Sequence, residues 1–132
     1  MTAKPIGLIG AGLLGSAIAA RLLEAGFRVI GYDNDPVKRD GLEAMGALLA
    51  SGPSTVAASS NQIILSLPNS LIAAQVMEQM LPSLTPGSLV MDTTTGSPRD
   101  AQAAAALLEA RGSGYMDASV GGSSKQDRKS VV

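Results

Sequence analysis

The chain has 132 residues, of which 45% are hydrophobic and 16% charged, and this is enough for one domain with a buried core. The net charge of -1 and the aromatic content of 2% argue against a nucleic-acid partner and against an anionic membrane surface. Cysteine and histidine are absent, which excludes disulfides, thiolate and imidazole chemistry and the usual zinc sites, so no metal is expected. No apolar run reaches the roughly 20 residues of a membrane-spanning helix. We therefore expect a cytoplasmic protein.

Apolar runs alternate with segments of helical periodicity along the chain. Six apolar runs predict strands, in chain order residues 6–9, 28–32, 47–50, 62–67, 88–92 and 115–120. Five segments with helical periodicity lie between them. The first begins at the glycine-rich motif and reaches residue 24, and the others lie at residues 36–45, 53–59, 70–80 and 98–111. This alternation predicts a parallel sheet with right-handed crossovers.

Several of these helices carry signals at their ends. Asp35-Pro36 places an N-cap residue before a proline at the first helical position. The segment Ser97–Asp100 combines an N-cap, a proline and an acidic third residue. Gly26 and Gly46 are expected to end the first two helices.

Two helices show repeated apolar residues. Leu14, Ile18 and Leu22 recur at helical spacing in the first helix. In the fourth helix we expect one buried stripe, made of Ile72, Val76 and Met80 with Ala73 and Met77 beside them.

The predicted fold class is α/β, a doubly wound parallel sheet (Rossmann fold) with strand order 3-2-1-4-5-6 in a single domain over residues 1–120. Residues 121–132 are expected to form the start of a substrate loop and a terminal tail. Ligands of such sheets bind beyond the carboxyl ends of the strands, at the switch point between the first and fourth strands. This rule selects five polar or turn-forming segments, namely Gly10–Gly15, Asp33, Leu67–Asn69, Thr93–Thr95 and Asp117–Ser124.

The glycine-rich segment after the first strand matches the dinucleotide-binding fingerprint, and its residues are Gly10, Ala11, Gly12, Leu13, Leu14 and Gly15. The first glycine permits a sharp turn, the second lets backbone N–H groups approach a pyrophosphate, and the third lets helix and strand pack closely. The pyrophosphate would lie at the helix N-terminus, where unpaired N–H groups and the helix dipole favour negative charge. The segment therefore predicts a nicotinamide or flavin nucleotide as ligand.

Asp33, at the end of the second strand, favours NAD over NADP as the cofactor. A carboxylate at this position accepts hydrogen bonds from ribose hydroxyls and repels a 2′-phosphate, which an arginine would accommodate. Asn34 stands where NADP-preferring relatives would offer that arginine. Lys38 and Arg39 are within reach of a phosphate, although solvated charges on the second helix are the simpler interpretation.

Four motifs in chain order resemble those of the β-hydroxyacid dehydrogenase family, and they are Gly7–Gly15, Leu67–Ser70, Asp92–Pro98 and Asp117–Ser123. This family includes 3-hydroxyisobutyrate dehydrogenase, tartronate semialdehyde reductase and, more remotely, 6-phosphogluconate dehydrogenase. The Leu-Pro-Asn-Ser and Asp-Ala-x-Val stretches are more specific to the family than the glycine motif. The resemblance implies that Leu67, Pro68, Asn69 and the hydroxyl of Thr95 contact the cofactor.

The resemblance also implies a site for a small carboxylate substrate, formed by Gly121, Gly122 and Ser123. Successive backbone N–H groups in a glycine-rich turn form an anion-binding concavity, which agrees with this role. Ser119 and Gly121 stand where the family usually has proline and serine, and Leu14 stands where it has methionine. These departures leave the identity of the substrate open.

Two classes of function remain open at this stage. The family's enzymes have a second, helical domain that carries a lysine acting as general acid and base, and the resemblance places both beyond this chain. The first class is therefore the cofactor domain of a dehydrogenase that moves hydride between the nicotinamide and a small β-hydroxyacid, inactive alone. The second is a free-standing module that binds or senses NAD without turnover. Self-association through the edge of the sixth strand and the Asp117–Ser124 loop is a further expectation, because these surfaces would lack their usual covering domain.

Overall fold

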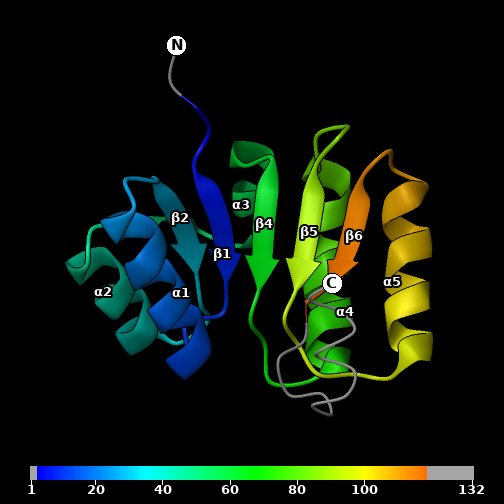
Figure 1. The fold of residues 1–132 in the computed structure, drawn as a ribbon, viewed down its shortest axis with the longest axis horizontal. Coiled ribbons are helices and arrows are strands. Elements are labelled where there is room, and N and C mark those ends of the chain that lie inside the picture. Colours follow the sequence, from blue (N-terminus) through cyan, green and yellow to red (C-terminus); the bar gives the residue numbers. More distant parts are fainter. Residues whose placement is uncertain (1–2, 119–132) are drawn as a thin grey trace.

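A computed structural model of the chain describes residues 3–118, whose six parallel strands follow the order β3-β2-β1-β4-β5-β6 (Figure 1). The strands are β1 (Ile6–Ile9), β2 (Val29–Tyr32), β3 (Leu48–Leu49), β4 (Gln62–Leu65), β5 (Leu89–Asp92) and β6 (Gly114–Asp117). The helices are α1 (Leu13–Glu24), α2 (Pro36–Ala44), α3 (Pro53–Ser59), α4 (Ser70–Met80) and α5 (Pro98–Glu109), with a short 3-10 helix η1 (Leu81–Ser83) after α4. The predicted fold class and strand order are confirmed.

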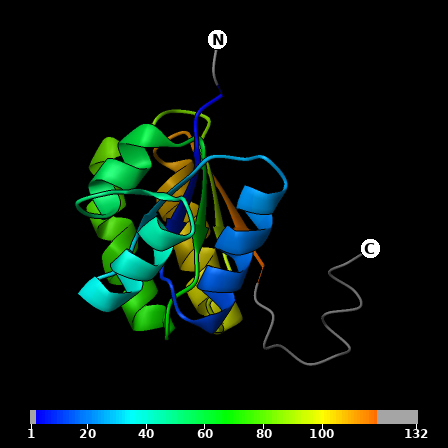
Figure 2. The same ribbon diagram turned by 90° about the vertical axis from the view of Figure 1, so that its left-hand side faces the viewer.

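Two clusters of buried side chains attach helices to the two faces of the sheet. On one face, Leu8 of β1 packs in a cluster with Ala19 of α1 and Leu42 of α2. On the other face, Ile9 belongs to a cluster that includes Met77 of α4 and residues of α3 and α5. Successive residues of a strand point to opposite faces, so Leu8 and Ile9 anchor the two layers. Figure 2 shows α1 and α4 on opposite sides of the sheet.

The capping signals read from the sequence are present in the structure. The Asp35 carboxylate accepts a hydrogen bond from the Val37 N–H at 2.9 Å, which caps α2. At α5, the Ser97 hydroxyl accepts from the Asp100 N–H at 3.1 Å, and the Asp100 carboxylate accepts from the Ser97 N–H at 3.3 Å. Gly46 has φ +108°, a left-handed conformation that favours glycine where a helix ends.

The buried face of α1 is made of smaller residues than its periodicity suggests. Gly15 and Ala19 are the buried residues of this helix, whereas Leu14 is 37% exposed. A Cβ atom added at Gly15 would lie 2.0 Å from the carbonyl oxygen of Gly10. Close approach of helix and strand therefore decides which face is buried, and the larger side chains lie beside the contact.

The buried stripe of α4 also differs from the expected one. Ala73, Met77 and Met80 are buried, as expected, but Ile72 and Val76 are only half-buried. The side chains of Ile72 and Val76 line a cleft at the carboxyl ends of the central strands, which explains their partial exposure. Periodicity alone does not distinguish a side chain that faces the core from one that faces a ligand cleft.

Most strands are slightly shorter than the apolar runs that predicted them. The strand β4 ends at Leu65. The Ser66 N–H still donates to the Ile9 carbonyl of β1, whereas the Leu67 N–H donates to the Thr94 hydroxyl instead of a strand. The strand β6 begins one residue earlier than predicted, at Gly114, and ends at Asp117. The end of the predicted run, residues 119–120, lies outside the described residues.

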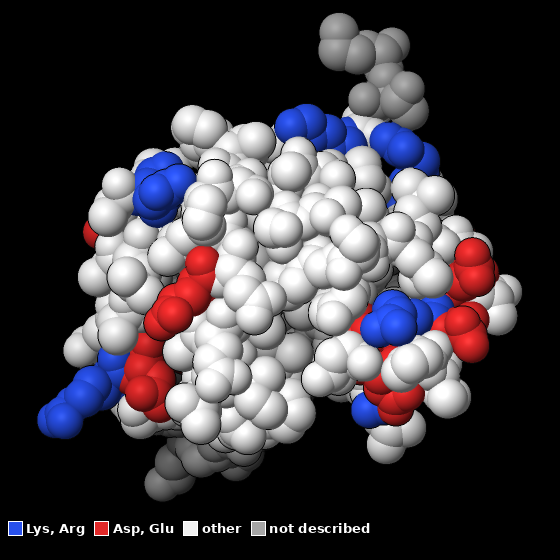
Figure 3. All heavy atoms as spheres, turned by 180° about the vertical axis from the view of Figure 1, so that it is seen from behind, with Lys and Arg blue, Asp and Glu red and all other residues white. Residues whose placement is uncertain are grey.

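The face of the molecule opposite to that of Figure 1 has a broad uncharged centre, and charged side chains gather toward its sides (Figure 3). The sequence explains this centre, since α3 has no charged residue and α4 has only Glu78. Within residues 3–118, no helix is long and apolar enough to cross a membrane. The same residues contain no group of three or more Asp or Glu side chains that could hold a metal ion.

Candidate cofactor-binding site

A cleft of about 440 Å³ opens at the carboxyl ends of β1, β2 and β4. Its volume lies within the range of about 300–1,000 Å³ that is typical of small-molecule sites. The cleft lies at the predicted switch point, because α1 follows β1 on one face of the sheet and α4 follows β4 on the other. Eight of the predicted cofactor residues line it, namely Gly10, Gly12, Leu13, Leu14, Asp33, Asn34, Leu67 and Pro68.

Gly10 is required by the fold itself. Its φ is +103°, and a Cβ atom added there would lie 2.0 Å from the carbonyl oxygen of Ser66. The chain therefore turns out of β1 in direct contact with the segment that follows β4. Leu67 adds to this contact, because its Cδ2 atom lies 3.2 Å from the same Cβ position.

Gly12 has no comparable requirement within the fold. It has φ -73° and ψ -159°, an extended conformation that any residue adopts, and an added Cβ would meet no described atom within 4 Å. The residue is the N-cap of α1, and the structure shows no side-chain cap at this end among the described residues. The first turn carries no acidic side chain. The arrangement therefore fits close approach of an anionic ligand to backbone N–H groups and to the positive end of the helix dipole.

Asp33 is half-buried at the end of β2 and joins two segments of the cleft. Its Oδ2 atom accepts from the Ala11 N–H at 2.8 Å, and its Oδ1 atom accepts from the Asp35 N–H at 2.9 Å. Each carboxylate oxygen can accept further hydrogen bonds. Asp33 can therefore hold the glycine loop and still receive hydroxyl donors from a ligand in the cleft.

Arg39 is not a solvated charge, contrary to the simpler interpretation of the sequence. Its Nη1 atom donates to the backbone carbonyl of Asp33 at 2.7 Å, and its guanidinium lies 5.8 Å from the centre of the Tyr32 ring. The Arg39 guanidinium is thus held by a carbonyl group and an aromatic ring of the protein. Lys38 is exposed and lines the cleft.

Four predicted cofactor residues do not line the cleft. Ala11 and Gly15 are buried beside it. The Ala11 N–H donates to Asp33, and Gly15 packs against Gly10. Asn69 caps α4, because its side chain accepts from the Ile72 N–H at 2.9 Å. Thr95 is exposed in the loop after β5. The predicted substrate residues Gly121, Gly122 and Ser123 lie outside the described residues.

One wall of the cleft was not recognised from the sequence. It is the face of α4 that carries Ile72, Gln75, Val76 and Gln79. Two pairs of these residues are spaced by four, which places all of them on one side of the helix. The signal that distinguishes this face from the core is the pair of glutamines, which would be costly to bury.

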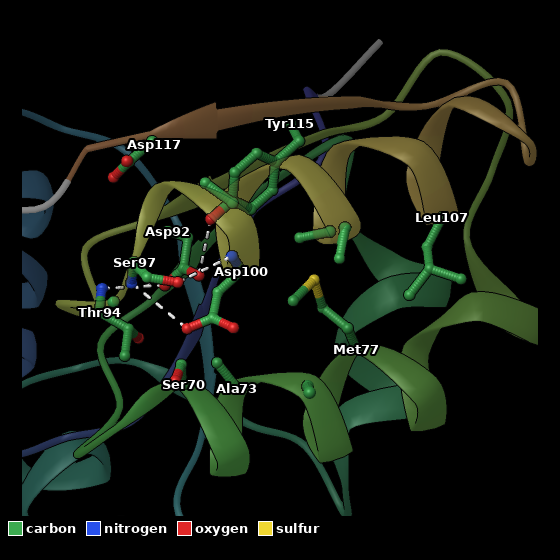
Figure 4. A pocket seen from close by; sticks show the side chains of 15 residues that line it. Ser70, Ala73, Met77, Asp92, Thr94, Ser97, Asp100, Leu107, Tyr115 and Asp117 are labelled. Atoms are coloured by element: carbon green, nitrogen blue, oxygen red, sulfur yellow. Dashed lines mark hydrogen bonds between the residues drawn. The ribbon is translucent and has the colours of Figure 1, made fainter.

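A second cavity, of about 110 Å³, lies between α4, α5 and the ends of β5 and β6 (Figure 4). Asp92, only 4% exposed, accepts from the Thr94 N–H at 2.9 Å and from the Tyr115 hydroxyl at 3.0 Å. Met77 and Leu107 form its apolar side. Burial, together with the charge of Asp92, raises the pKa of Tyr115 far above its ordinary value, so the phenol keeps its proton. The cavity is too small for a dinucleotide.

The fold, the glycine loop on an uncapped helix and the acidic residue after β2 together define a dinucleotide-binding domain of the Rossmann class. Residues 5–131 match the family described as the NAD binding domain of 6-phosphogluconate dehydrogenase. The chain therefore belongs to this family of NAD(P)-binding domains, within the β-hydroxyacid dehydrogenases.

Relatives of known identity agree with this assignment. Mitochondrial 3-hydroxyisobutyrate dehydrogenase from Mus musculus is 34% identical over 121 residues, which cover 89% of this chain and 36% of the mouse protein. A structure of 3-hydroxyisobutyrate dehydrogenase from Mycobacterium tuberculosis with L-serine superposes with a TM-score of 0.86 at 29% identity. That match covers 94% of this chain and 43% of the mycobacterial chain. The chain thus spans less than half the length of both relatives.

A more distant similarity extends to enzymes with another substrate class. A reductive aminase from Aspergillus terreus, solved in complex with NADPH and ethyl-5-oxohexanoate, has a TM-score of 0.74 and 26% identity. The match covers 86% of this chain and 40% of the aminase chain. Proteins similar to this chain thus include one solved with NADPH, and the choice between NAD and NADP depends on the residues of this chain.

Proposed function

We propose that this chain is the NAD-binding domain of an oxidoreductase that transfers hydride between the nicotinamide and a small β-hydroxyacid. The proposal is supported by the family and by the similarity to two 3-hydroxyisobutyrate dehydrogenases. We also propose that the protein is located in the cytoplasm.

The observation that carries the proposal is the open space at Gly12. A glycine with an ordinary backbone conformation and no described neighbour within 4 Å of its Cβ position has no role in folding that requires glycine. It lines the cleft at the N-terminus of a helix of 12 residues. Close approach of a pyrophosphate to the backbone explains why a side chain is absent there.

The preference for NAD over NADP rests on Asp33. Its carboxylate lines the cleft while bonding to the Ala11 and Asp35 N–H groups, so its position is fixed before a ligand binds. A carboxylate in this position repels a 2′-phosphate and accepts hydrogen bonds from ribose hydroxyls. Arg39, the arginine of the helix that follows Asp33, already donates to the Asp33 carbonyl.

The described residues bind and orient the cofactor in this proposal, and they do not move the proton. Bound NAD would supply the hydride chemistry. The titratable residues of the cleft are Tyr32, Asp33 and Lys38, all at the end of β2 and the start of α2. This is the side of the ribose contact, away from the reacting ring. We place the proton-transferring lysine beyond the described residues, and assign the substrate carboxylate to Gly121, Gly122 and Ser123.

Titration calorimetry with NADH and NADPH tests the proposal. The chain is expected to bind both cofactors, with tighter binding of NADH. Equal affinities would remove the role given to Asp33, and absence of binding to either cofactor would refute the assignment of the cleft. Binding without any turnover in the complete protein would favour a module that senses NAD.

A further inference from the structure

Tyr115, on the edge strand β6, contacts a buried carboxylate that has no role in the site described above. In the register of the sheet Tyr115 pairs with Val90, so Asp92 lies two residues further along the neighbouring strand, on the same face. The Tyr115 ring points across this face, and its hydroxyl donates to Asp92 Oδ2 at 3.0 Å (Figure 4). The phenol stays protonated, as argued above, and remains a donor.

Asp92 is also bonded to the loop that follows β5. Its other oxygen, Oδ1, accepts from the Thr94 N–H at 2.9 Å. Both oxygens of the buried carboxylate are thus held by neutral donors, and loss of either donor would leave a buried acceptor unsatisfied. The direction of the carboxylate therefore depends on Tyr115.

The loop after β5 in turn holds the loop after β4. The Thr93 N–H and hydroxyl both donate to the Leu65 carbonyl, at 2.9 and 2.7 Å. The Leu67 N–H donates to the hydroxyl of Thr94 at 3.4 Å, and Thr94 is itself 7% exposed. Leu67 and Pro68 form a wall of the cofactor cleft, and Leu67 lies next to Gly10 of the glycine loop.

We propose that Tyr115 is a positioning residue for the cofactor cleft, which acts through Asp92 and Thr94 to fix the Leu67–Pro68 wall. The proposal rests on the cofactor role proposed for the cleft. The smaller cavity then has a structural role, since the bond between Tyr115 of β6 and Asp92 of β5 lies in its wall. Removal of the Tyr115 hydroxyl should free Asp92 to turn, release the Thr94 N–H and loosen the wall at Leu67.

Hydrogen exchange of backbone amides tests the link without any cofactor. In Tyr115→Phe, the Leu67 and Thr94 amides of the cofactor-free chain should exchange at least about fivefold faster, while the Leu8 amide in the centre of the sheet is unchanged. Ser113→Ala is the matched control. It removes a hydroxyl bonded to the Thr85 carbonyl near the amino ends of β5 and β6, away from the Asp92 carboxylate. Unchanged exchange at Leu67 and Thr94 in Tyr115→Phe would overturn the proposal.

Calorimetry with two ligands separates positioning from general damage to the fold. The dissociation constant of NADH should rise about fivefold in Tyr115→Phe, which is about 1 kcal/mol at 1.4 kcal/mol per factor of ten. Binding of ADP should be unchanged, because the adenosine half of the cofactor contacts the glycine loop and Asp33 and not the Leu67–Pro68 wall. Equal weakening of both ligands, or of neither, would contradict the proposal.

Two further substitutions test the individual links. In Asp92→Asn the amide can accept from Thr94 and donate to the Tyr115 hydroxyl, so NADH affinity should be retained, whereas Asp92→Ala should reduce it. Thr94→Val keeps the size of the side chain and removes the acceptor of the Leu67 N–H, so it tests the last link if Tyr115→Phe does not fold. Failure of the native chain to bind NADH would refute the proposed function alone, since hydrogen exchange still decides the role of Tyr115.

Discussion

The carboxylate of Asp33 accepts the backbone N–H of Ala11 at 2.8 Å, and this bond joins the end of β2 to the glycine loop after β1. One residue therefore combines two roles. It holds the glycine loop, which we propose as the pyrophosphate site, and it would present a negative charge to the ribose of a bound cofactor. Any change at Asp33 should alter the affinity for the cofactor as well as the choice between NAD and NADP.

Replacement of Asp33 by asparagine should weaken NADH binding roughly tenfold, since a hydrogen bond to a charged group is lost, and leave NADPH binding unchanged or tighter. The amide can still accept one of the two N–H groups that Asp33 binds, so the fold is retained. Calorimetry with both cofactors measures the ratio of the dissociation constants of NADH and NADPH. Asp40→Asn is the matched control, because Asp40 is exposed on α2 and does not line the cleft. An unchanged ratio in Asp33→Asn would contradict the assignment.

Replacement of Gly12 by valine should abolish detectable binding of NADH without unfolding the chain. The valine side chain would enter open space in the cleft and block at least two hydrogen bonds to the charged pyrophosphate, each of about 1.5–3 kcal/mol, so the loss is about a hundredfold or more. Gly41→Val is the control. Gly41 also has no described atom within 4 Å of its Cβ position, but it lies in α2, outside the cleft. Circular dichroism checks the fold, and survival of NADH affinity would show that the phosphate loop is misplaced.

Most of the helix ends could be predicted because local signals decide them, and the strand order because alternating strands and helices with right-handed crossovers leave few arrangements. Asp35-Pro36 and the Ser97–Asp100 box each satisfy the free N–H groups of a helix within a few residues, so the caps are visible in the sequence. The burial of Ile72 and Val76 could not be predicted in the same way. Their exposure depends on a cleft formed by segments far apart in the sequence.

Residues of the candidate site were predictable where the chemistry of the site requires one particular residue type. Gly10, Gly12 and Asp33 are examples, because a tight turn, the proposed close approach of a ligand to the backbone and the proposed ribose contact each require a particular residue. The bond from Tyr115 to Asp92 was not predictable, since nothing in the sequence reveals the register of β6 against β5. The role of Arg39 was missed because its partners are a carbonyl group and an aromatic ring.

Acid should destabilise the N-terminus of α5 through Asp100. Hydrogen bonds from the backbone and side chain of Ser97 lower the pKa of Asp100 below its ordinary value of 3.8. The pKa is lower in the folded chain, so the stabilisation is present above 3.8 and is lost as the pH falls through the folded value. Urea unfolding at a series of pH values should show the advantage of the native chain over Asp100→Asn near neutral pH and its disappearance in acid. A difference that is independent of pH would contradict this prediction.

The edge strand β6 is expected to mediate self-association. The strand is at the end of the sheet, and its Met116 side chain is 48% exposed. Free strand edges with apolar side chains tend to pair with other chains. Sedimentation velocity should show a concentration-dependent dimer that Met116→Lys shifts toward monomer. Val37→Lys, which changes an exposed residue of α2, should have no effect, and a monomer at all concentrations would refute the prediction.

The chain by itself should not oxidise 3-hydroxyisobutyrate or glycerate with NAD, even where calorimetry shows that it binds the cofactor. Hydride transfer needs a group that takes or gives the hydroxyl proton. The described cleft offers only Tyr32, Asp33 and Lys38 as titratable side chains, and all three lie at the end of β2 or the start of α2, where we propose the ribose contact. Lys125 and Lys129 lie outside the described residues, in a stretch without a sequence pattern that would tune a general acid or base.

The measurement is the appearance of NADH absorbance with each acid, in parallel with calorimetry that verifies NAD binding by the same sample. Mouse 3-hydroxyisobutyrate dehydrogenase, which is 34% identical over the shared region, serves as the positive control. Turnover by the chain would contradict the prediction and would implicate a lysine near its end. In that case Lys125→Met should abolish turnover and leave NAD affinity intact, because loss of the proton-transfer group affects the chemical step and not the binding of the cofactor.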